Sequence, residues 1–365
     1  MAGKPTLFLH VGPGKTGTSA IQKWLRDHRA QLREDGYFYP LPEQMGLFEG
    51  NASSLAQALL SPGEASDLRS IAAGYAALLE AEGASHLILS AEQLASVSPD
   101  NLRSFHAAAS EWFDIRIIIA ARHPYPWLWS VWGQFVKRRG EWRNFPAFAA
   151  RAAPTYDVYE RFFENFSDVV LLTYADHGLL RHFANALHVD PDRYGVDEAE
   201  TEIINRSLSY AELQTLLCIN QTCRNARVST RISDYMVTRR PGVAAHVVVD
   251  EDVLASVEEI CGPAMNALER RSPGCTAWTS RPEGRDNRAL TRGNLTLPRD
   301  VLAQIVTVVR EEEAERLSAE FAARLDVAYP APPSTRAQSG DVGKTGGWLR
   351  ARLKRLHGAF GGRAR

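Results

Sequence analysis

Short apolar runs alternate with segments of helical periodicity along the first half of the chain. Four runs have the length of buried strands, at Leu7–Val11, His86–Ser90, Ile115–Ala121 and Val169–Tyr174. Strands that alternate with helical segments are typical of a parallel sheet that is covered on both faces. The pattern therefore predicts an α/β fold, in which helices flank a central and mostly parallel sheet.

The segments between and after these runs carry apolar residues at helical spacing. The predicted helices cover about Ser19–Gly36, Ala65–Gly83, Leu102–Trp112, Leu179–Leu187, Ser209–Asn220, Asp250–Arg271 and Pro298–Leu325. Tyr37–Pro40 is expected to be a short strand that proline ends. Residues 41–64 and 272–293 are rich in glycine and proline and are expected to be loops, whereas residues 224–247 show no clear periodicity. The last of these helices are expected to be C-terminal additions to the part of the chain that forms the sheet.

The composition is that of an ordinary globular protein. The 365 residues are 45% apolar and 23% charged, which is ample for one large core. Lysine and arginine number 42 against 43 acidic residues, so the formal charge of −1 gives no bulk attraction to nucleic acid. The four cysteines lack metal-ligand spacing and suit reduced thiols. Since only five apolar residues precede the first glycine turn, we expect a cytoplasmic protein without a signal peptide or membrane anchor.

The turn after the first apolar run concentrates groups that bind anions. It covers Gly12–Thr18, reads Gly-Pro-Gly-Lys-Thr-Gly-Thr, and leads directly into a predicted helix. Glycines let the backbone approach an anion closely, and N–H groups at a helix N-terminus point toward it. Lys15 adds a positive charge, and the hydroxyls of Thr16, Thr18 and Ser19 add donors. The context predicts a phosphate-binding loop, with an ordinary glycine-rich turn as the alternative.

The spacing of this turn differs from that of a nucleoside triphosphatase P-loop. That loop requires a glycine five residues before its Gly-Lys pair, and this chain has Leu9 there. The tetrapeptide Gly-Lys-Thr-Gly occurs again at Gly343–Gly346, after proline- and serine-rich sequence and without a preceding strand. We interpret the second copy as linker, because an anion loop needs the strand and the helix on its two sides.

In its context the turn resembles the 5′-phosphosulfate loop of sulfotransferases that use 3′-phosphoadenosine-5′-phosphosulfate (PAPS). Bacterial members of this family typically read Gly-x-x-Lys-Thr-Gly-Thr-Thr/Ser. The matching positions are Gly12, Lys15, Thr16, Gly17, Thr18 and Ser19. Gln22 stands where these proteins often carry glutamine. Gly14 departs from the pattern, since many bacterial relatives have histidine at that position.

A second phosphate motif follows the strand predicted at Ile115–Ala121. Arg122 ends this strand, and Ser130 lies eight residues later on a tryptophan-rich helix that begins after prolines. A guanidinium at a strand end and a hydroxyl in the next helix can converge on one phosphate. The pair resembles the sulfotransferase motif for the 3′-phosphate of PAPS. A strand-end arginine and a helical serine without any ligand remain the alternative for this motif alone.

Two motifs in family order imply a PAPS-dependent sulfotransferase with a P-loop nucleotide-kinase-like fold, a resemblance that covers about residues 5–220. It implies PAPS as cosubstrate, PAP as product and no metal. The acceptor implied is a hydroxyl compound, in particular a glycan or glycolipid. The cofactor-binding residues implied are Gly12, Gly14, Lys15, Thr16, Gly17, Thr18, Ser19, Arg122 and Ser130.

Lys15 and Glu92 are the two residues assigned to catalysis. Lys15 would stabilise negative charge on the bridging oxygen as PAP leaves. Glu92 directly follows the strand predicted at His86–Ser90, at the edge where open α/β sheets bind ligands, and would take the acceptor's proton. The identity of the base stays open, because Glu92 could merely charge the first turn of a helix, and His10 or His106 could replace it.

Two other classes of function stay open from the sequence. A small-molecule kinase of the P-loop type would need an acidic Mg²⁺ ligand at a strand end, for which Asp176 is the candidate. A non-catalytic nucleotide-binding module would use the same anion loop without needing a base.

We expect a single sulfotransferase domain over residues 1–328. Its PAPS-binding motifs lie within 5–140, and its helical acceptor side covers about 200–328. Residues 329–347 are predicted to be a flexible linker. Residues 348–365 form a basic amphipathic tail, a pattern typical of helices that lie on anionic membranes. The sequence leaves two alternatives for this tail. It could contact the inner face of the membrane peripherally, or it could be solvated and have no partner.

Overall fold

The structure is a computed structural model that describes most of the chain as far as residue 328. The described residues are 3–41, 50–60, 68–174, 178–196, 206–243, 245, 247–273, 282, 285–286 and 299–328. Two compact units are distinguished, Met1–Val309 and Arg310–Arg365, and every site discussed below belongs to the first. The expected linker and tail at 329–365 lie outside the described residues, as does Asp176.

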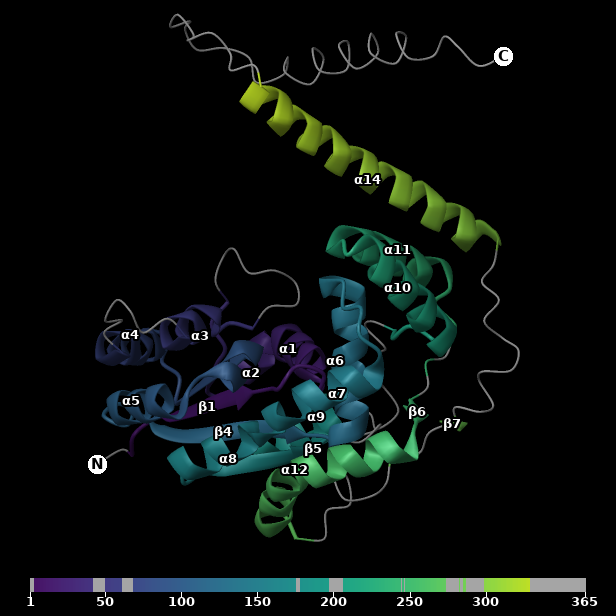
Figure 1. Cartoon of the computed structure of the whole chain (residues 1–365). Helices are drawn as coiled ribbons and strands as arrows, with labels where there is room; N and C mark the ends of the chain where they lie inside the picture. Colours follow the sequence, from purple (N-terminus) through teal and green to yellow (C-terminus); the bar gives the residue numbers. More distant parts are fainter. Residues whose placement is uncertain are drawn as a thin grey trace, which may run out of the picture. The chain divides into compact units, whose positions relative to one another are not determined.

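Five parallel strands form the central sheet (Figure 1). They are β1 (Thr6–Val11), β2 (Tyr37–Phe38), β3 (His86–Ala91), β4 (Asp114–Ala121) and β5 (Val169–Thr173). Their order across the sheet is β2-β3-β1-β4-β5, and each neighbouring pair is parallel. The predicted α/β fold with a central parallel sheet between helices is confirmed.

The central strands form because their residues are apolar toward both faces. In β1 every residue from Leu7 to Val11 is at most 2% exposed, and in β4 Ile117–Ala121 are fully buried. Burying a large aliphatic side chain stabilises the fold by about 1.5–3 kcal/mol. A continuous apolar run, rather than an alternating one, is what a strand buried on both faces requires.

Helices cover both faces of the sheet and make a three-layer arrangement. One face packs against α1 (Thr18–Asp27), α2 (Arg29–Glu34) and α9 (Leu179–Ala186). The other face packs within the larger core cluster. The helices that contribute to this cluster include α3 (Ser53–Leu60), α4 (Leu68–Ala81), α5 (Pro99–Ala109), α6 (Pro124–Arg139), α7 (Phe145–Ala152) and α8 (Val158–Asn165).

The C-terminal part of the first unit adds helices to this second layer. They are α10 (Tyr210–Cys223), α11 (Ala226–Arg239), α12 (Glu251–Arg271) and the beginning of α14 (Arg299–Ala328). Both α10 and α11 pack against α6, as Figure 1 shows, and α12 packs against α7 and α8. The smaller elements are the 3₁₀ helices η1 (Glu92–Ser96) and η2 (Ala153–Asp157) and the short strands β6 (Val248–Val249) and β7 (Arg285–Asp286).

Two segments expected to lack helices contain them. Within 41–64, α3 forms and buries Leu55, Ala56 and Leu59 against the core. Within 224–247, α11 forms because a narrow stripe of apolar residues, four apart, lies among its arginines and packs inward. Tertiary contacts, rather than local preference, stabilise helices of this kind.

The first predicted helix, Ser19–Gly36, is interrupted. It is divided at His28 into α1 and α2, and the His28 ring is hydrogen-bonded through Nδ1 to the carbonyl oxygen of Trp24 at 2.9 Å. The same Trp24 carbonyl also accepts the His28 backbone N–H at 3.0 Å, so the ring contact adds to the last turn of α1 and replaces no helical hydrogen bond.

Candidate functional site

The predicted loop lies where the connections of the sheet diverge. The chain leaving β1 runs toward β2 and β3 on one side of the sheet, and the chain leaving β4 runs toward β5 on the other. Ligands of open α/β sheets bind at such a switch point, beside the carboxyl ends of the strands. The loop at Gly12–Gly17 and the turn at Arg122 therefore border the same crevice, as the motifs require.

The backbone of the loop is folded into a tight turn that requires glycine at two positions. Gly17 has φ of 89°, and a Cβ there would lie 2.2 Å from Cδ2 of Leu179. At Gly12 a Cβ would lie 2.0 Å from Oγ1 of Thr18. Lys15 also has a positive φ, of 73°, which is uncommon for a residue with a side chain and is often found at functional sites.

The loop presents unpaired donors to the crevice. No backbone N–H from Gly14 to Ser19 donates a hydrogen bond to any part of the chain that the structure describes. Among the described residues the buried hydroxyl of Thr18 has no hydrogen-bond partner, whereas that of Thr16 donates to the Pro13 carbonyl at 2.7 Å. Free N–H groups at the start of α1, together with a lysine, are what an anion at a helix N-terminus needs. These residues fit a phosphosulfate group.

Glu92 lies beside this loop. It is the first residue after β3, and a Cβ on Gly14 would be 3.5 Å from its Oε2 atom. Desolvation raises the pKa of Glu92, and the Lys15 ammonium opposes this rise. Desolvation likewise lowers the pKa of Lys15, against the influence of Glu92 and together with that of Arg138. The structure thus brings both predicted catalytic residues together.

A buried polar cluster holds the end of β3 next to β1. Ser90 Oγ lies 2.8 Å from Nδ1 of His10 and accepts a bond from Gln22 at 3.2 Å. The side chain of Asn51 pairs with the β3 backbone through the Ser90 N–H and the Ile88 carbonyl. Glu92 therefore extends from a strand end whose position is fixed by several hydrogen bonds.

The alternative bases pack against aromatic rings. His10 is 1% exposed, its ring packs against that of Phe183, and burial lowers its pKa to about 3. His106 is on α5 and packs edge-on against Phe166, with ring centroids 5.1 Å apart. These positions are those of structural histidines.

Arg122 and Ser130 follow β4 as predicted. The Arg122 guanidinium lies over the Tyr174 ring, 4.8 Å from its centroid, and the Arg122 carbonyl accepts a hydrogen bond from Tyr156. The same Tyr174 ring borders the loop, because a Cβ on Gly17 would be 3.2 Å from its Cε2 atom. Ser130 is half-buried on α6. The guanidinium and the loop are therefore neighbours across one aromatic ring.

Three further residues of the site had not been singled out from the sequence. Trp127 donates from its indole Nε1 to the Gly14 carbonyl at 2.9 Å, which ties α6 to the loop. Tyr174 follows β5, so its position at a strand end was the signal available. Lys137 is buried on α6 near Lys15, and its spacing from Ser130 along the helix could have indicated it.

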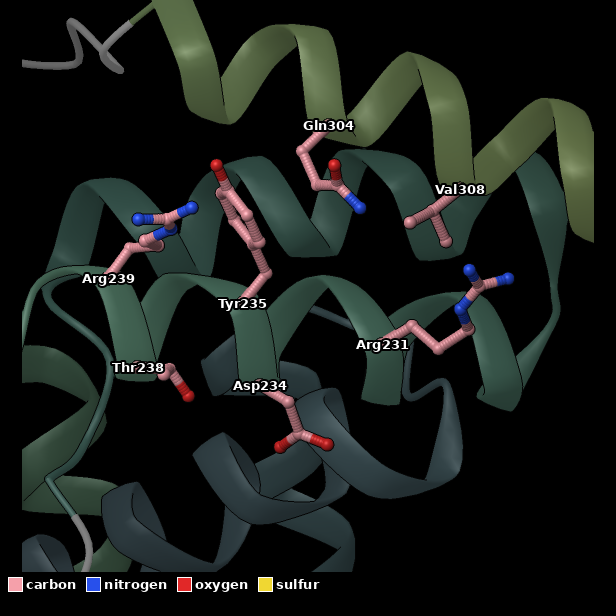
Figure 2. Close-up of a pocket in the computed structure, with 7 residues that line it drawn as sticks. All are labelled: Arg231, Asp234, Tyr235, Thr238, Arg239, Gln304 and Val308. Carbon is pink, nitrogen blue, oxygen red and sulfur yellow. The ribbon is translucent and has the colours of Figure 1, made fainter.

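A separate shallow cavity of about 400 Å³ lies between α11 and the first part of α14 (Figure 2). Its lining residues are Arg231, Asp234, Tyr235, Thr238, Arg239, Gln304 and Val308. None of these is a residue that the sequence motifs predicted.

The described residues contain no group of three or more His, Cys, Asp or Glu side chains placed to hold a metal ion. Their helices include none that combines the length and apolar character needed to cross a bilayer.

Solved structures that are similar to this chain include two sulfotransferase domains. The domain from the curacin biosynthetic pathway is 12% identical, with a TM-score of 0.37 over 72% of this chain and 98% of that one. The domain from the Synechococcus PCC 7002 olefin synthase is 14% identical, with a TM-score of 0.34 over 72% and 96% of the two chains.

A third similar structure is retinol dehydratase in complex with androsterone and the inactive cofactor PAP. It is 14% identical, with a TM-score of 0.33 over 75% of this chain and 85% of that one. No family model matches the sequence, and no curated protein matches it.

Proposed function

We propose that this chain is a sulfotransferase that moves a sulfuryl group from PAPS to a hydroxyl acceptor. The observation that carries the proposal is the loop at Gly14–Ser19, whose N–H groups donate to no described residue, with Glu92 beside it and Lys15 within it. The Arg122 guanidinium across the Tyr174 ring supports a second anion subsite. A 3′,5′-bisphosphorylated nucleotide is a ligand with two anionic groups for these two places.

The loop would hold the 5′-phosphosulfate through backbone N–H groups and the Thr18 hydroxyl. Arg122 and Ser130 would hold the 3′-phosphate, with Arg122 making the stronger, charge-assisted contact. The Tyr174 ring keeps the guanidinium in place by a cation–π contact, which contributes about 0.5–1 kcal/mol at partly exposed sites.

The reaction in this proposal is an in-line displacement at sulfur. The acceptor oxygen forms a bond to sulfur, and the bond between sulfur and the bridging oxygen of the 5′-phosphate breaks. Lys15 stabilises the negative charge that stays on PAP, while the acceptor's proton passes to the Glu92 carboxylate. Because desolvation raises the pKa of Glu92, this carboxylate is a stronger base than one in water.

The proposal also includes a class of acceptor and a cellular location. Resemblance to bacterial sulfotransferases favours a glycan or glycolipid hydroxyl as acceptor. We place the enzyme in the cytoplasm, where its basic C-terminal segment would reach an anionic membrane surface. Transfer of ³⁵S from labelled PAPS to glycans or to a cell extract would identify the acceptor.

The proposal is tested by comparing PAP with ATP in titration calorimetry. We expect PAP to bind at least about tenfold more tightly than ATP, since only PAP has a 3′-phosphate for Arg122. Lys15→Ala should abolish sulfuryl transfer while the circular dichroism spectrum stays unchanged. Tighter binding of ATP, or wild-type turnover by the Lys15 variant, would contradict the proposal.

A further inference from the structure

Lys137 is a buried lysine of the site that neither motif includes. It lies near the end of α6 and is only 8% exposed. Trp127, Ser130, Gln134 and Lys137 are spaced three, four and three residues apart, so they share one face of the helix. Trp127 on this face contacts the Gly14 carbonyl directly. The face that carries Lys137 is therefore turned toward the anion loop.

Three positive groups and one carboxylate act electrostatically on Lys137, so its positive charge is not balanced by them. Lys15 approaches from the loop, Arg138 from α6, Arg206 from the segment before α10 and Asp234 from α11. Asp234 is already bound to Arg138 at 2.7 Å. The Lys137 carbonyl accepts a hydrogen bond from the Thr230 hydroxyl at 3.3 Å, whereas its side-chain ammonium has no hydrogen bond and no ion pair within the part of the chain that the structure describes.

The third positive group near Lys137, Arg206, is already paired with a carboxylate. Arg206 forms a two-point contact with the buried carboxylate of Glu212, with nitrogen–oxygen distances of 2.8 and 2.9 Å, and donates to the Met236 carbonyl. Lys15 and Lys137 are therefore two neighbouring lysines for which the described residues supply no ion pair.

We propose that Lys137 binds the sulfuryl group of PAPS together with Lys15. The inference rests on the proposed function and extends it to a residue outside the motifs. In the proposed complex Lys15 contacts the 5′-phosphosulfate from the loop. The part of this ligand that both lysines could contact is its terminal sulfuryl group. Lys137 thereby distinguishes PAPS from PAP, which has both phosphates but no sulfuryl group.

The electrostatics of the pocket agree with an anion at this place. Desolvation, and then the neighbouring positive charges Arg138 and Lys15, lower the pKa of Lys137 to about 8, against the influence of Asp234. Glu92 is near Lys15 and partly balances its charge. A bound sulfuryl group would raise the pKa of Lys137 again, because it favours the protonated amine. Binding of PAPS near pH 8 should therefore take up protons.

The first test measures the affinities of PAPS and PAP for Lys137→Met, which keeps the apolar stem. We expect PAPS affinity to fall by about tenfold or more and PAP affinity to stay within about twofold of wild type. Arg139→Met is the matched control, since it removes an exposed charge from the same end of α6. Equal losses for the two ligands, or no loss for either, would overturn the proposal.

The second test counts protons by calorimetry in buffers of different ionisation enthalpy. Because burial and the neighbouring positive charges lower the pKa of Lys137 to about 8, wild type should take up more protons on binding PAPS at pH 8 than Lys137→Met does. Lys137→Arg, which stays charged, should retain PAPS binding and lose this uptake. Unchanged uptake in both variants would contradict the inference.

If wild type binds neither PAPS nor PAP, the proposed function fails and this inference fails with it. If wild type binds both and only the Lys137 comparison shows no difference, the sulfotransferase proposal stands and the role of Lys137 does not.

Discussion

The carboxylate of Glu92 lies where solvent is partly excluded and where the Lys15 ammonium acts on it. The two influences on its pKa are opposed, since desolvation raises it and Lys15 lowers it. In the proposed reaction, the first influence would favour a base that works near neutral pH, and the second would keep the carboxylate ionised before the acceptor arrives. Once Lys15 binds the leaving group in that reaction, its effect on Glu92 would weaken and the carboxylate would become more basic.

Replacing Glu92 by Gln tests this assignment. The amide keeps the size and hydrogen bonding of the side chain but cannot accept the acceptor's proton. We expect PAP affinity within about twofold of wild type and a kcat reduced by roughly 10²–10⁴-fold. Steady-state kinetics with ³⁵S-labelled PAPS measures the effect, and Glu80→Gln on the exposed face of α4 is the control. A reduction below about tenfold would assign the proton transfer to another group.

Individual residues were predictable when one local rule placed them. Glu92 could be found because it directly follows an apolar strand, and carboxyl ends of parallel strands share an edge. Lys137 and Tyr174 were missed, because their roles come from neighbours in other elements. Lys137 is near Lys15 although it lies over one hundred residues later in the chain. A local sequence pattern cannot predict a contact between residues so far apart.

At the scale of elements, the anion loop depends on a helix and a strand that follow much later in the chain. Leu179 at the start of α9 and Tyr174 after β5 pack directly against Gly17. Two things therefore favour glycine at position 17: its positive φ, and the side chains of Leu179 and Tyr174, which occupy the space that a Cβ would need. The loop's shape is a property of the packed α/β layer and not of its glycines alone.

Gly17→Ala should disrupt the loop more than backbone strain alone can explain. The added methyl group would clash with Leu179, so we expect an extra destabilisation of about 1–3 kcal/mol and a PAP affinity at least tenfold lower. Gly36→Ala is the matched control, since Gly36 has φ of 85° and no atom within 4 Å of a Cβ. That change should cost about 1–2 kcal/mol and leave PAP binding unaffected.

Urea unfolding and calorimetry with PAP measure both quantities in the two variants. If the two alanine variants lost the same stability and both retained PAP binding, the packing around Gly17 would have no part in forming the loop.

The elements themselves were predictable to different degrees. The four long strands were recognised because their apolar runs are continuous. The helix predicted from Ser209 corresponds to α10, which a capping box formed by Ser209 and Glu212 begins. The helix α11 was missed, since its many arginines hide the stripe formed by Val228, Ile232 and Met236. That helix is stabilised by packing on α6, which a local pattern does not contain.

At the scale of the whole first unit, buried polar groups connect layers that are far apart in sequence. The pair between Arg206 and Glu212 ties the segment before α10 to the end of α11 through the Met236 carbonyl. The cluster around Ser90 joins β1, β3 and α1. Breaking one partner of such a buried pair is strongly destabilising, by about 3–5 kcal/mol for an ion pair.

Buried histidines add a pH dependence to the stability of the whole fold. Burial lowers the pKa of His10 to about 3 and that of His123 to about 4, from the usual 6.5. Between about pH 6.5 and 4 the unfolded chain therefore binds protons that the folded chain does not. The free energy of unfolding is highest above pH 6.5 and falls below it, by up to about 1.4 kcal/mol per pH unit for each histidine.

His10→Gln should flatten this decline, because the variant has one fewer buried group that protonates only on unfolding. Urea titrations at about pH 7.5, 6 and 5 give the slope, which we expect to fall by roughly 1.4 kcal/mol per pH unit relative to wild type in the lower interval. The absolute stability of the variant is allowed to drop, since it also loses the contact with Ser90. If His10→Gln declined as steeply as wild type, His10 would be protonated in the folded chain, and its exclusion as the catalytic base would have to be withdrawn.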